Sequence, residues 1–192
     1  LQEILEEKNE YIERCLGGKG YLLEEVYEKY CPFGRTLKNY VKNVNLIMEK
    51  LAAVREGKLE LDPYIVAELR RRFAFEFDGM RMHELYFAQM EAGSRKLEAG
   101  SALANAVKEK YGEKGLEAHI KEVARTRGIG WVVVYKDTIA GTLHTTFVAD
   151  HEVGQLAGLP IVFALDLLEH AYMVDYMPVD KKNYIDAFFA NV

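Results

Sequence analysis

The sequence predicts an α+β fold in which a long helical hairpin precedes a half that combines helices with a small antiparallel sheet. Apolar residues recur at helical spacing through the N-terminal half. Three short segments of the C-terminal half are instead rich in β-branched and aromatic residues. Gly93 and Ser94 interrupt the pattern between them. We therefore expect a helical-hairpin domain at residues 1–93 and an α+β domain at residues 94–192.

Turn and cap residues mark where the N-terminal helices begin and end. Gly17 ends the first apolar pattern, and Pro32 breaks the second. Thr36 is a suitable N-cap for a third helix, and Pro63 is a typical first residue of a fourth. The helices expected in this half cover residues 1–16, 21–30, 37–55 and 63–91.

The C-terminal half changes period after a glycine-rich segment at residues 128–130. Three strands are expected, at residues 131–135, 141–148 and 160–165, with the first two forming a hairpin. Shorter helices are expected before and after them, at residues 101–111, 114–127, 167–177 and 180–190.

Composition is typical of a globular protein and excludes two classes of partner. The chain has 192 residues, 49% of them hydrophobic and 29% charged, which suffices for a well-buried core. No apolar run approaches the roughly 20 residues of a membrane span. A net charge of -5 argues against nucleic acid as a partner. We expect neither a nucleic-acid nor a membrane partner.

Cysteine content and the first residues bear on location. Cys15 and Cys31 are not in metal-type spacing and suggest free thiols in a reducing compartment. Residues 1–13 lack the basic and then apolar pattern of a signal peptide. A cytoplasmic location is therefore expected. The basic run at residues 70–72 fits either a solvated helix face or a patch that steers a small anion, and the sequence leaves both open.

Three ionisable residues lie close together in an apolar stretch near the C-terminus. The strand at 160–165 delivers Asp166, and His170 follows within one helical turn. Carboxylate and imidazole donors suit iron, manganese or zinc. A hydrogen-bonded Asp–His pair at a helix start is the alternative interpretation. Glu169 points off another helix face and is free to orient a histidine.

The surrounding motif resembles that of a known family. The segment DLLEHAY at residues 166–172, followed by DY at 175–176 and YI at 184–185, resembles the C-terminal signature of iron/manganese superoxide dismutases. The order of elements is also similar to that family's fold. The resemblance implies that Asp166 and His170 are metal ligands, that Glu169 reaches the ligand histidine of a second subunit, and that Tyr172 joins the active-site network.

A second motif resembles another ligand-bearing helix of the family. By itself, His83 is a histidine on an apolar helix face. The segment FDGMRMHELYF at residues 77–87 resembles the family's second ligand helix, with a glycine four residues before the histidine and an aromatic pair after it. The resemblance implies that His83 is a metal ligand.

Further positions take roles from the same resemblance. His151 aligns with an outer-sphere residue that tunes the metal potential through the solvent ligand, although a loop histidine without function is the alternative. Trp131 matches a residue that lines the metal pocket, and core packing is its alternative role. Tyr40 corresponds to the gateway tyrosine beside the substrate channel. His119 and His144 are expected to be ordinary surface or strand histidines.

The sequence departs from the family at the first ligand. The family places that histidine eight residues before the gateway tyrosine, a position occupied here by Pro32, and a second histidine falls on Thr36. No histidine precedes His83. Proline has no donor atom and breaks a helix. Three alternatives stay open: water fills the position, Cys31 or another donor replaces the histidine, or no metal binds.

Other family residues are also replaced. Leu168 and Phe87 stand where the family usually has tryptophans. Thr36 cannot make the hydrogen bond that the family's histidine gives to the tyrosine equivalent to Tyr172. We therefore expect a less rigid pocket and a changed metal potential.

The resulting prediction is an antioxidant oxidoreductase that dismutates superoxide at one iron or manganese ion per chain, held by His83, Asp166 and His170. Its activity would be reduced or altered, with Tyr40 and His151 relaying protons. A homodimer or a dimer of dimers is expected. The alternative is a non-catalytic dimeric protein that retains the fold. A different metal-dependent redox activity is a third reading.

Overall fold

The computed structural model describes residues 34–90 and 97–191. Contacts divide the chain into two compact units, Leu1–Glu76 and Phe77–Val192. The division falls inside the helix α4 (Pro63–Ala88). The predicted domain boundary after residue 93 lies in the segment 91–96, outside the described residues, and stays a prediction. The helices expected at 1–16 and 21–30 also lie outside them.

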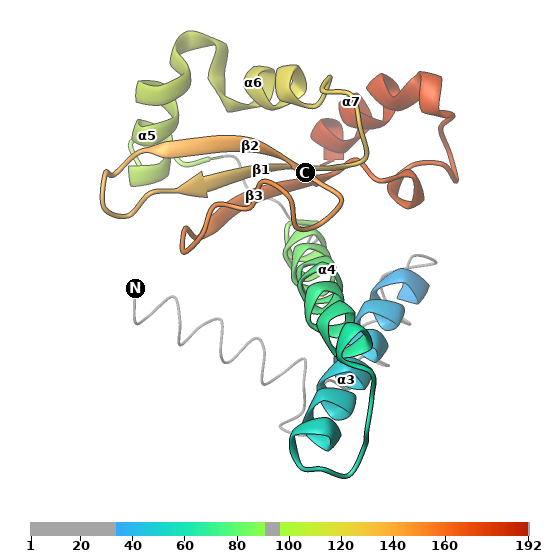
Figure 1. Cartoon of the computed structure of the whole chain (residues 1–192). Coiled ribbons are helices and arrows are strands. Elements are labelled where there is room, and N and C mark those ends of the chain that lie inside the picture. The colour runs from blue at the N-terminus through green and yellow to red at the C-terminus, as the bar shows by residue number, and fades with distance from the viewer. Residues whose placement is uncertain (1–33, 91–96, 192) are drawn as a thin grey trace. The chain divides into compact units, whose positions relative to one another are not determined.

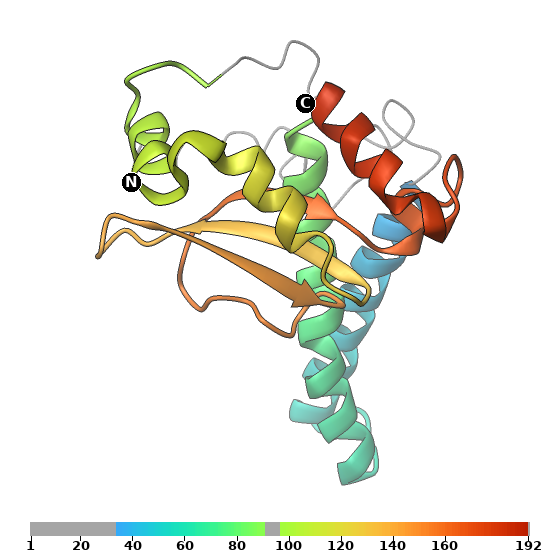
Figure 2. The same cartoon turned by 90° about the horizontal axis from the view of Figure 1, so that it is seen from above.

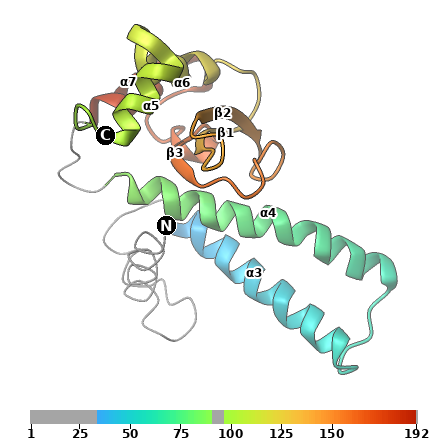
Figure 3. The same ribbon diagram turned by 90° about the vertical axis from the view of Figure 1, so that its left-hand side faces the viewer.

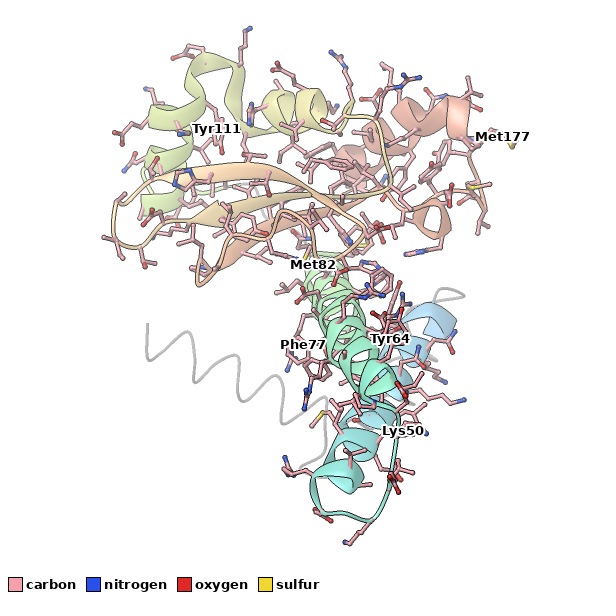
Figure 4. All side chains as sticks on the ribbon, in the orientation of Figure 1. Lys50, Tyr64, Phe77, Met82, Tyr111 and Met177 are labelled. Atoms are coloured by element: carbon pink, nitrogen blue, oxygen red, sulfur yellow. The ribbon has the colours of Figure 1, made fainter. Side chains whose placement is uncertain are left out.

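The first unit contains the helical hairpin that the sequence predicts. The helix α3 (Gly34–Arg55) and the part of α4 up to Glu76 run in opposite directions, as Figure 3 shows. Thr36 lies inside α3 instead of capping it, because the helix begins at Gly34. Asp62 does cap α4, since its carboxylate accepts a 2.8 Å hydrogen bond from the backbone of Tyr64. Figure 4 marks Lys50 and Tyr64 on these helices.

Helical spacing explains which face of α3 is buried. The buried apolar residues recur every three or four positions, as expected for one stripe of an amphipathic helix. They are Leu37, Val41, Val44 and Ile47. Polar pairing supplements this stripe, because the buried carboxylate of Glu76 accepts hydrogen bonds from Arg72 at 2.7 Å and from Asn43 at 3.1 Å.

The basic run on α4 is exposed and largely neutralised along its own helix. Arg71 pairs with Glu68 at 2.9 Å and Arg72 with Glu76 at 2.7 Å. The Arg72 guanidinium also lies 3.9 Å from the centre of the Phe75 ring. This pairing favours the interpretation of the run as a solvated helix face.

The second unit is built on an antiparallel sheet of three strands in the order β2-β1-β3. The strands are β1 (Gly130–Lys136), β2 (Leu143–Ala149) and β3 (Ile161–Asp166). The central strand β1 has a neighbour on each edge, and its residues Trp131 to Tyr135 are at most 1% exposed. Burial on both faces explains why this strand is continuously apolar instead of alternating. The predicted strands are therefore confirmed.

Helices cover the sheet. The helices α5 (Ala102–Tyr111) and α6 (Gly115–Val123) lie along one face, joined by the short turn η1 (Gly112–Lys114), as Figures 1 and 2 show. Ser101 caps α5 by accepting a 3.1 Å hydrogen bond from the backbone of Ala104. The last helix, α7 (Lys181–Asn191), adds its inner face to the same core, which also contains Met82 of α4. Figure 4 labels Met82 and Tyr111.

Two predicted helices differ from the structure. The helix α6 ends at Val123 and not at residue 127, because tighter backbone hydrogen bonds close its last turn before Gly128, whose φ is 133°. Residues 167–177 form no regular α-helix. They contain only the short 3-10 turn η2 (Glu169–Ala171) and further turns, since Leu168 is extended and its backbone N–H donates to the Asp166 carboxylate at 2.8 Å.

A glutamine just beyond α4 covers part of the free edge of β3. Its side-chain amide donates to the Ala164 carbonyl and accepts from the Ala164 N–H, both at 2.8 Å. Gln89 thereby satisfies two backbone groups that β1 does not pair. Among the helices of residues 34–90 and 97–191, none is long and apolar enough to cross a membrane.

Candidate metal centre

Three potential metal donors from separate parts of the second unit converge. His83 comes from α4, Asp166 from the end of β3 and His170 from η2. The two histidine Nε2 atoms are 2.9 Å apart, and Asp166 Oδ2 lies 3.5 Å from His83 Nε2 and 3.2 Å from His170 Nε2. Within the described part of the chain, this is the only such group of three or more donors.

The backbone of α4 fixes the orientation of His83. Its Nδ1–H donates to the carbonyl of Gly79, one turn earlier, so that Nε2 faces the other two donors with a lone pair. The Trp131 ring stands edge-on to the imidazole at a centroid distance of 5.0 Å. Burial lowers the pKa of His83, and the Asp166 carboxylate opposes that shift. Burial thus favours the neutral imidazole, which is the form that binds metals.

Asp166 is positioned through both its side chain and its backbone. Oδ1 accepts the hydrogen bond from Leu168, which leaves Oδ2 facing the two histidines. The Asp166 carbonyl accepts a 2.8 Å hydrogen bond from the hydroxyl of Tyr184 on α7. The Tyr86 hydroxyl lies 2.9 Å from that of Tyr184 and can donate to it, because the Tyr184 proton is already used.

These two tyrosines are supporting residues for which the sequence motifs predict no role. Burial raises the pKa of Tyr184 well above its ordinary value, which keeps the donating hydroxyl protonated. The helical spacing of Tyr184, Ile185 and Phe188 on the buried face of α7 is the signal that could have revealed the first of them.

The spacing of the three donors fits a single transition-metal ion. Donors about 2.0–2.1 Å from one ion lie about 2.9 Å apart at a right angle and about 3.6 Å apart at 120°. All three observed separations, 2.9, 3.2 and 3.5 Å, fall in that interval. Two imidazoles and a carboxylate also match the donor preference of iron and manganese. The residues present therefore fit such an ion.

His151 and Trp131 form a buried pair beside the cluster. Trp131 Nε1–H donates to His151 Nδ1 at 3.0 Å, and neither side chain is exposed. Because Nδ1 accepts, the neutral His151 ring carries its proton on Nε2. The ring centroids of His151 and His83 are 5.7 Å apart. His151 is thus a buried, hydrogen-bonded neighbour of His83.

The other predicted site residues have different surroundings. Tyr172 is buried and stacks on Tyr184 at a centroid distance of 5.4 Å, and burial raises its pKa. Glu169 is exposed. Tyr40 lies on α3 in the first unit, where its ring is 6.1 Å from that of Phe75. The gateway role of Tyr40 stays a prediction.

The two remaining histidines lie outside the cluster. The His119 ring lies against that of Tyr111 in a tilted arrangement, at a centroid distance of 4.7 Å. His144 on β2 lies 3.6 Å from the Asp137 carboxylate. Both are partly exposed, and neither is among the three donors of the cluster.

Comparison with known proteins agrees with this arrangement. Residues 99–192 match the family described as iron/manganese superoxide dismutases, C-terminal domain. The chain is 35% identical to the iron superoxide dismutase of Aquifex aeolicus over 160 residues, which cover 81% of this chain and 73% of that protein. It is 30% identical to the iron superoxide dismutase of Saccharolobus solfataricus over 155 residues, or 79% and 73% of the two chains. The chain therefore belongs to the iron/manganese superoxide dismutase family.

One relative is named for manganese as well as iron. The manganese/iron superoxide dismutase of Aeropyrum pernix is 28% identical over 170 residues, which cover 86% of this chain and 76% of that protein. The predicted family membership and the predicted α+β fold are thus confirmed.

Proposed function

We propose that this protein binds one iron or manganese ion per chain through His83, Asp166 and His170 and that it dismutates superoxide. The convergence of these three donors in the second unit is the observation that carries the proposal. The names of the relatives, which are iron or manganese/iron superoxide dismutases, support the choice of metal and substrate.

The bound ion would supply one-electron chemistry, accepting an electron from one superoxide and giving it to another. The two imidazoles contribute neutral donors, and Asp166 contributes a buried negative charge that offsets the charge of the ion. The Leu168 N–H holds the Asp166 carboxylate, and the Tyr184 hydroxyl holds the backbone carbonyl of the same residue. Removing such supporting partners weakens metal sites.

Protons are also needed, because each reduced superoxide takes up two of them to form hydrogen peroxide. We assign their delivery to the Nε2–H of His151, which the hydrogen bond from Trp131 maintains, and to the hydroxyl of Tyr40. Tyr172 belongs to the surrounding network, where its raised pKa keeps the phenol protonated. We assign the exposed Glu169 to contact with a second subunit.

Reduced or altered activity is part of the proposal. Pro32 occupies the sequence position of the family's first ligand and has no donor atom. A site with fewer protein donors has a different potential, and dismutation requires a potential between those of the two half-reactions. The second candidate, a non-catalytic dimeric protein with this fold, rests on the same substitution. The dimeric state and the cytoplasmic location stay predictions.

Elemental analysis and a dismutase assay together test the proposal. The protein would be purified without added metal and also refolded with iron, manganese or zinc, with the Aquifex aeolicus relative as the control. About one iron or manganese per chain and measurable dismutation are expected. A stoichiometric ion without dismutation would favour the non-catalytic candidate. Absence of iron and manganese from every preparation would contradict both the site and the activity.

A further inference from the structure

A second feature of the unit that begins at Phe77 is a strongly cationic cavity. It has a volume of about 430 Å³ and lies between the end of α6 and the first residues of α7. Figures 1 and 2 show these two helices on the same side of the sheet. The lining includes five basic residues and a single carboxylate, namely Lys121, Arg125, Arg127, Lys181, Lys182 and Asp186. The chain as a whole has a net charge of -5, so this concentration of positive charge is local.

The single carboxylate is already engaged by two of the cations. Asp186 contacts Lys121 at 2.8 Å and Lys182 at 2.6 Å. Hydrogen bonds from these two lysines lower the pKa of Asp186 to about 2. Across residues 34–90 and 97–191, no carboxylate pairs with the other three cations, Arg125, Arg127 and Lys181. Lys121 also contacts Glu117, at 2.8 Å, so two carboxylates balance Lys121 and Lys182. The cavity therefore presents an uncompensated positive charge of three.

The floor of the cavity and the burial of Lys181 also favour the binding of an anion there. Lys181 is half-buried, and this burial lowers the pKa of its ammonium group, which no anion of the described chain offsets. Ala124 and Ile185 provide a buried apolar floor, and Thr126 adds a hydroxyl. A bound anion would compensate the desolvated ammonium directly.

We infer that this cavity binds a small multivalent anion of the phosphate or polycarboxylate class, held by Arg125, Arg127 and Lys181. Arginine guanidinium groups form paired hydrogen bonds with phosphate and carboxylate oxygens, and lysine adds a point charge. The volume lies within the range of small-molecule sites. The negative charge of the rest of the chain disfavours a long nucleic acid as the ligand.

Another cavity of the same unit offers a matched control. Its volume is about 600 Å³, and it lies between α5, α6 and β2. Its two lysines, Lys110 and Lys114, accompany the carboxylate of Glu122 and two histidines, His119 and His144. A double substitution there removes the same formal charge from the protein without touching the cationic cavity.

Calorimetric titration of the 192-residue chain tests the inference, with pyrophosphate, citrate and inorganic phosphate as separate probes at low ionic strength. The Arg125→Gln/Arg127→Gln variant should bind pyrophosphate about tenfold or more weakly than the unsubstituted protein. The Lys110→Gln/Lys114→Gln variant should change affinity less than about twofold. Preference for pyrophosphate or for citrate identifies the ligand as phosphorylated or as a polycarboxylate, and either result supports the site. Circular dichroism verifies that both variants fold.

Three results would overturn the inference. One is equal weakening in both double variants, which would mean diffuse electrostatic attraction. Another is the absence of binding of every probe at about 1 mM. The last is tight binding of a single-stranded oligonucleotide or of anionic phospholipid vesicles that pyrophosphate does not displace. The test compares variants that keep His83, Asp166 and His170 and uses no dismutase readout, so its outcome is independent of the proposed function.

Discussion

The two units differ in what they contribute to the candidate metal centre. All three donors of the cluster, His83, Asp166 and His170, belong to the unit that begins at Phe77. Pro32, which the sequence resemblance predicts to lie at the position of the family's first ligand, falls within the sequence range of the other unit. The donors that remain are thus those that a single unit can hold by its own packing. None of the three comes from the sequence range that contains Pro32.

The internal structure of the two units explains this difference. In the second unit, side-chain and backbone hydrogen bonds position Asp166, and a backbone carbonyl orients His83. The described part of the hairpin is instead organised by one apolar stripe along α3. A stripe of that kind tolerates many substitutions, whereas a convergent set of donors does not.

The largest effect on stability is expected from a substitution at Gly130, where the backbone of the second unit is most closely packed. An added Cβ at Gly130 would lie 2.0 Å from the Val148 carbonyl oxygen, at a φ of 149° that L residues rarely adopt. Gly130→Ala should therefore lower the free energy of unfolding by about 3 kcal/mol or more, and metal content should fall with it. Denaturant unfolding and elemental analysis measure the two changes.

A glycine of the hairpin is the matched control. Gly57 has a φ of 69°, but nothing lies within 4 Å of the position of its added Cβ. Gly57→Ala should cost only about 1 kcal/mol and leave metal content unchanged. Equal losses in the two variants would contradict the view that the second unit is the more tightly constrained.

Removal of a donor tests the assignment of the cluster itself. His83→Ala should weaken iron or manganese binding about a hundredfold or more, because the ligand and its orientation are both lost. His144→Ala removes a histidine that lies on β2 beside Asp137 and outside the cluster, and it should leave affinity unchanged. Metal affinity is measured by competition with a chelator. Retention of metal by His83→Ala would contradict the assignment.

Introducing a histidine at position 32 tests the contribution of the first unit's sequence range. Pro32→His places an imidazole at the position of the family's first ligand and should raise metal affinity about tenfold. Dismutase activity should rise as well. Pro32→Ala is the control, since it removes the proline without adding a donor. If both variants behave alike, the missing histidine does not limit the site.

The smallest effect on stability is expected from Asp186, which joins the two helices that line the cationic cavity. The pKa of Asp186 is lowered from 3.8 to about 2 by Lys121 and Lys182. A lowered folded-state pKa adds stability above the ordinary value, and this stability is lost as pH falls from 3.8 toward 2. Asp186→Asn should therefore lower Tm slightly at about pH 6 but not near pH 2. A difference in Tm that persists in acid would contradict this explanation.

Strong local patterns made most of the fold predictable. The apolar stripe of α3 and the β-branched run of β1 each correspond to an observed element within a few residues. The helix predicted at residues 167–177 is the main error. A helical pattern does not show that the Asp166 side chain accepts a hydrogen bond from the backbone N–H of Leu168. A short 3-10 turn still brings His170 within 3.2 Å of Asp166, so the pairing of these residues was predicted correctly although the helix was wrong.

The supporting residues of the candidate site were harder to predict. The motifs named His83 and Asp166, but the contact of Tyr184 with the Asp166 carbonyl joins residues separated by 18 positions. The orientation of Trp131 toward His151 spans 20 positions and depends on the loop after β2. Such contacts follow from tertiary packing and have no periodic signal in the sequence.

The side-chain amide of Gln89 has a consequence for how this protein behaves when crowded. The outer edge of β3 is a strand edge on which a second chain could otherwise add by β-pairing. By occupying both backbone groups of Ala164, Gln89 acts as a one-residue substitute for a fourth strand. An approaching chain would have to displace two hydrogen bonds before its own could form. We therefore expect Gln89 to oppose edge-to-edge aggregation of the sheet.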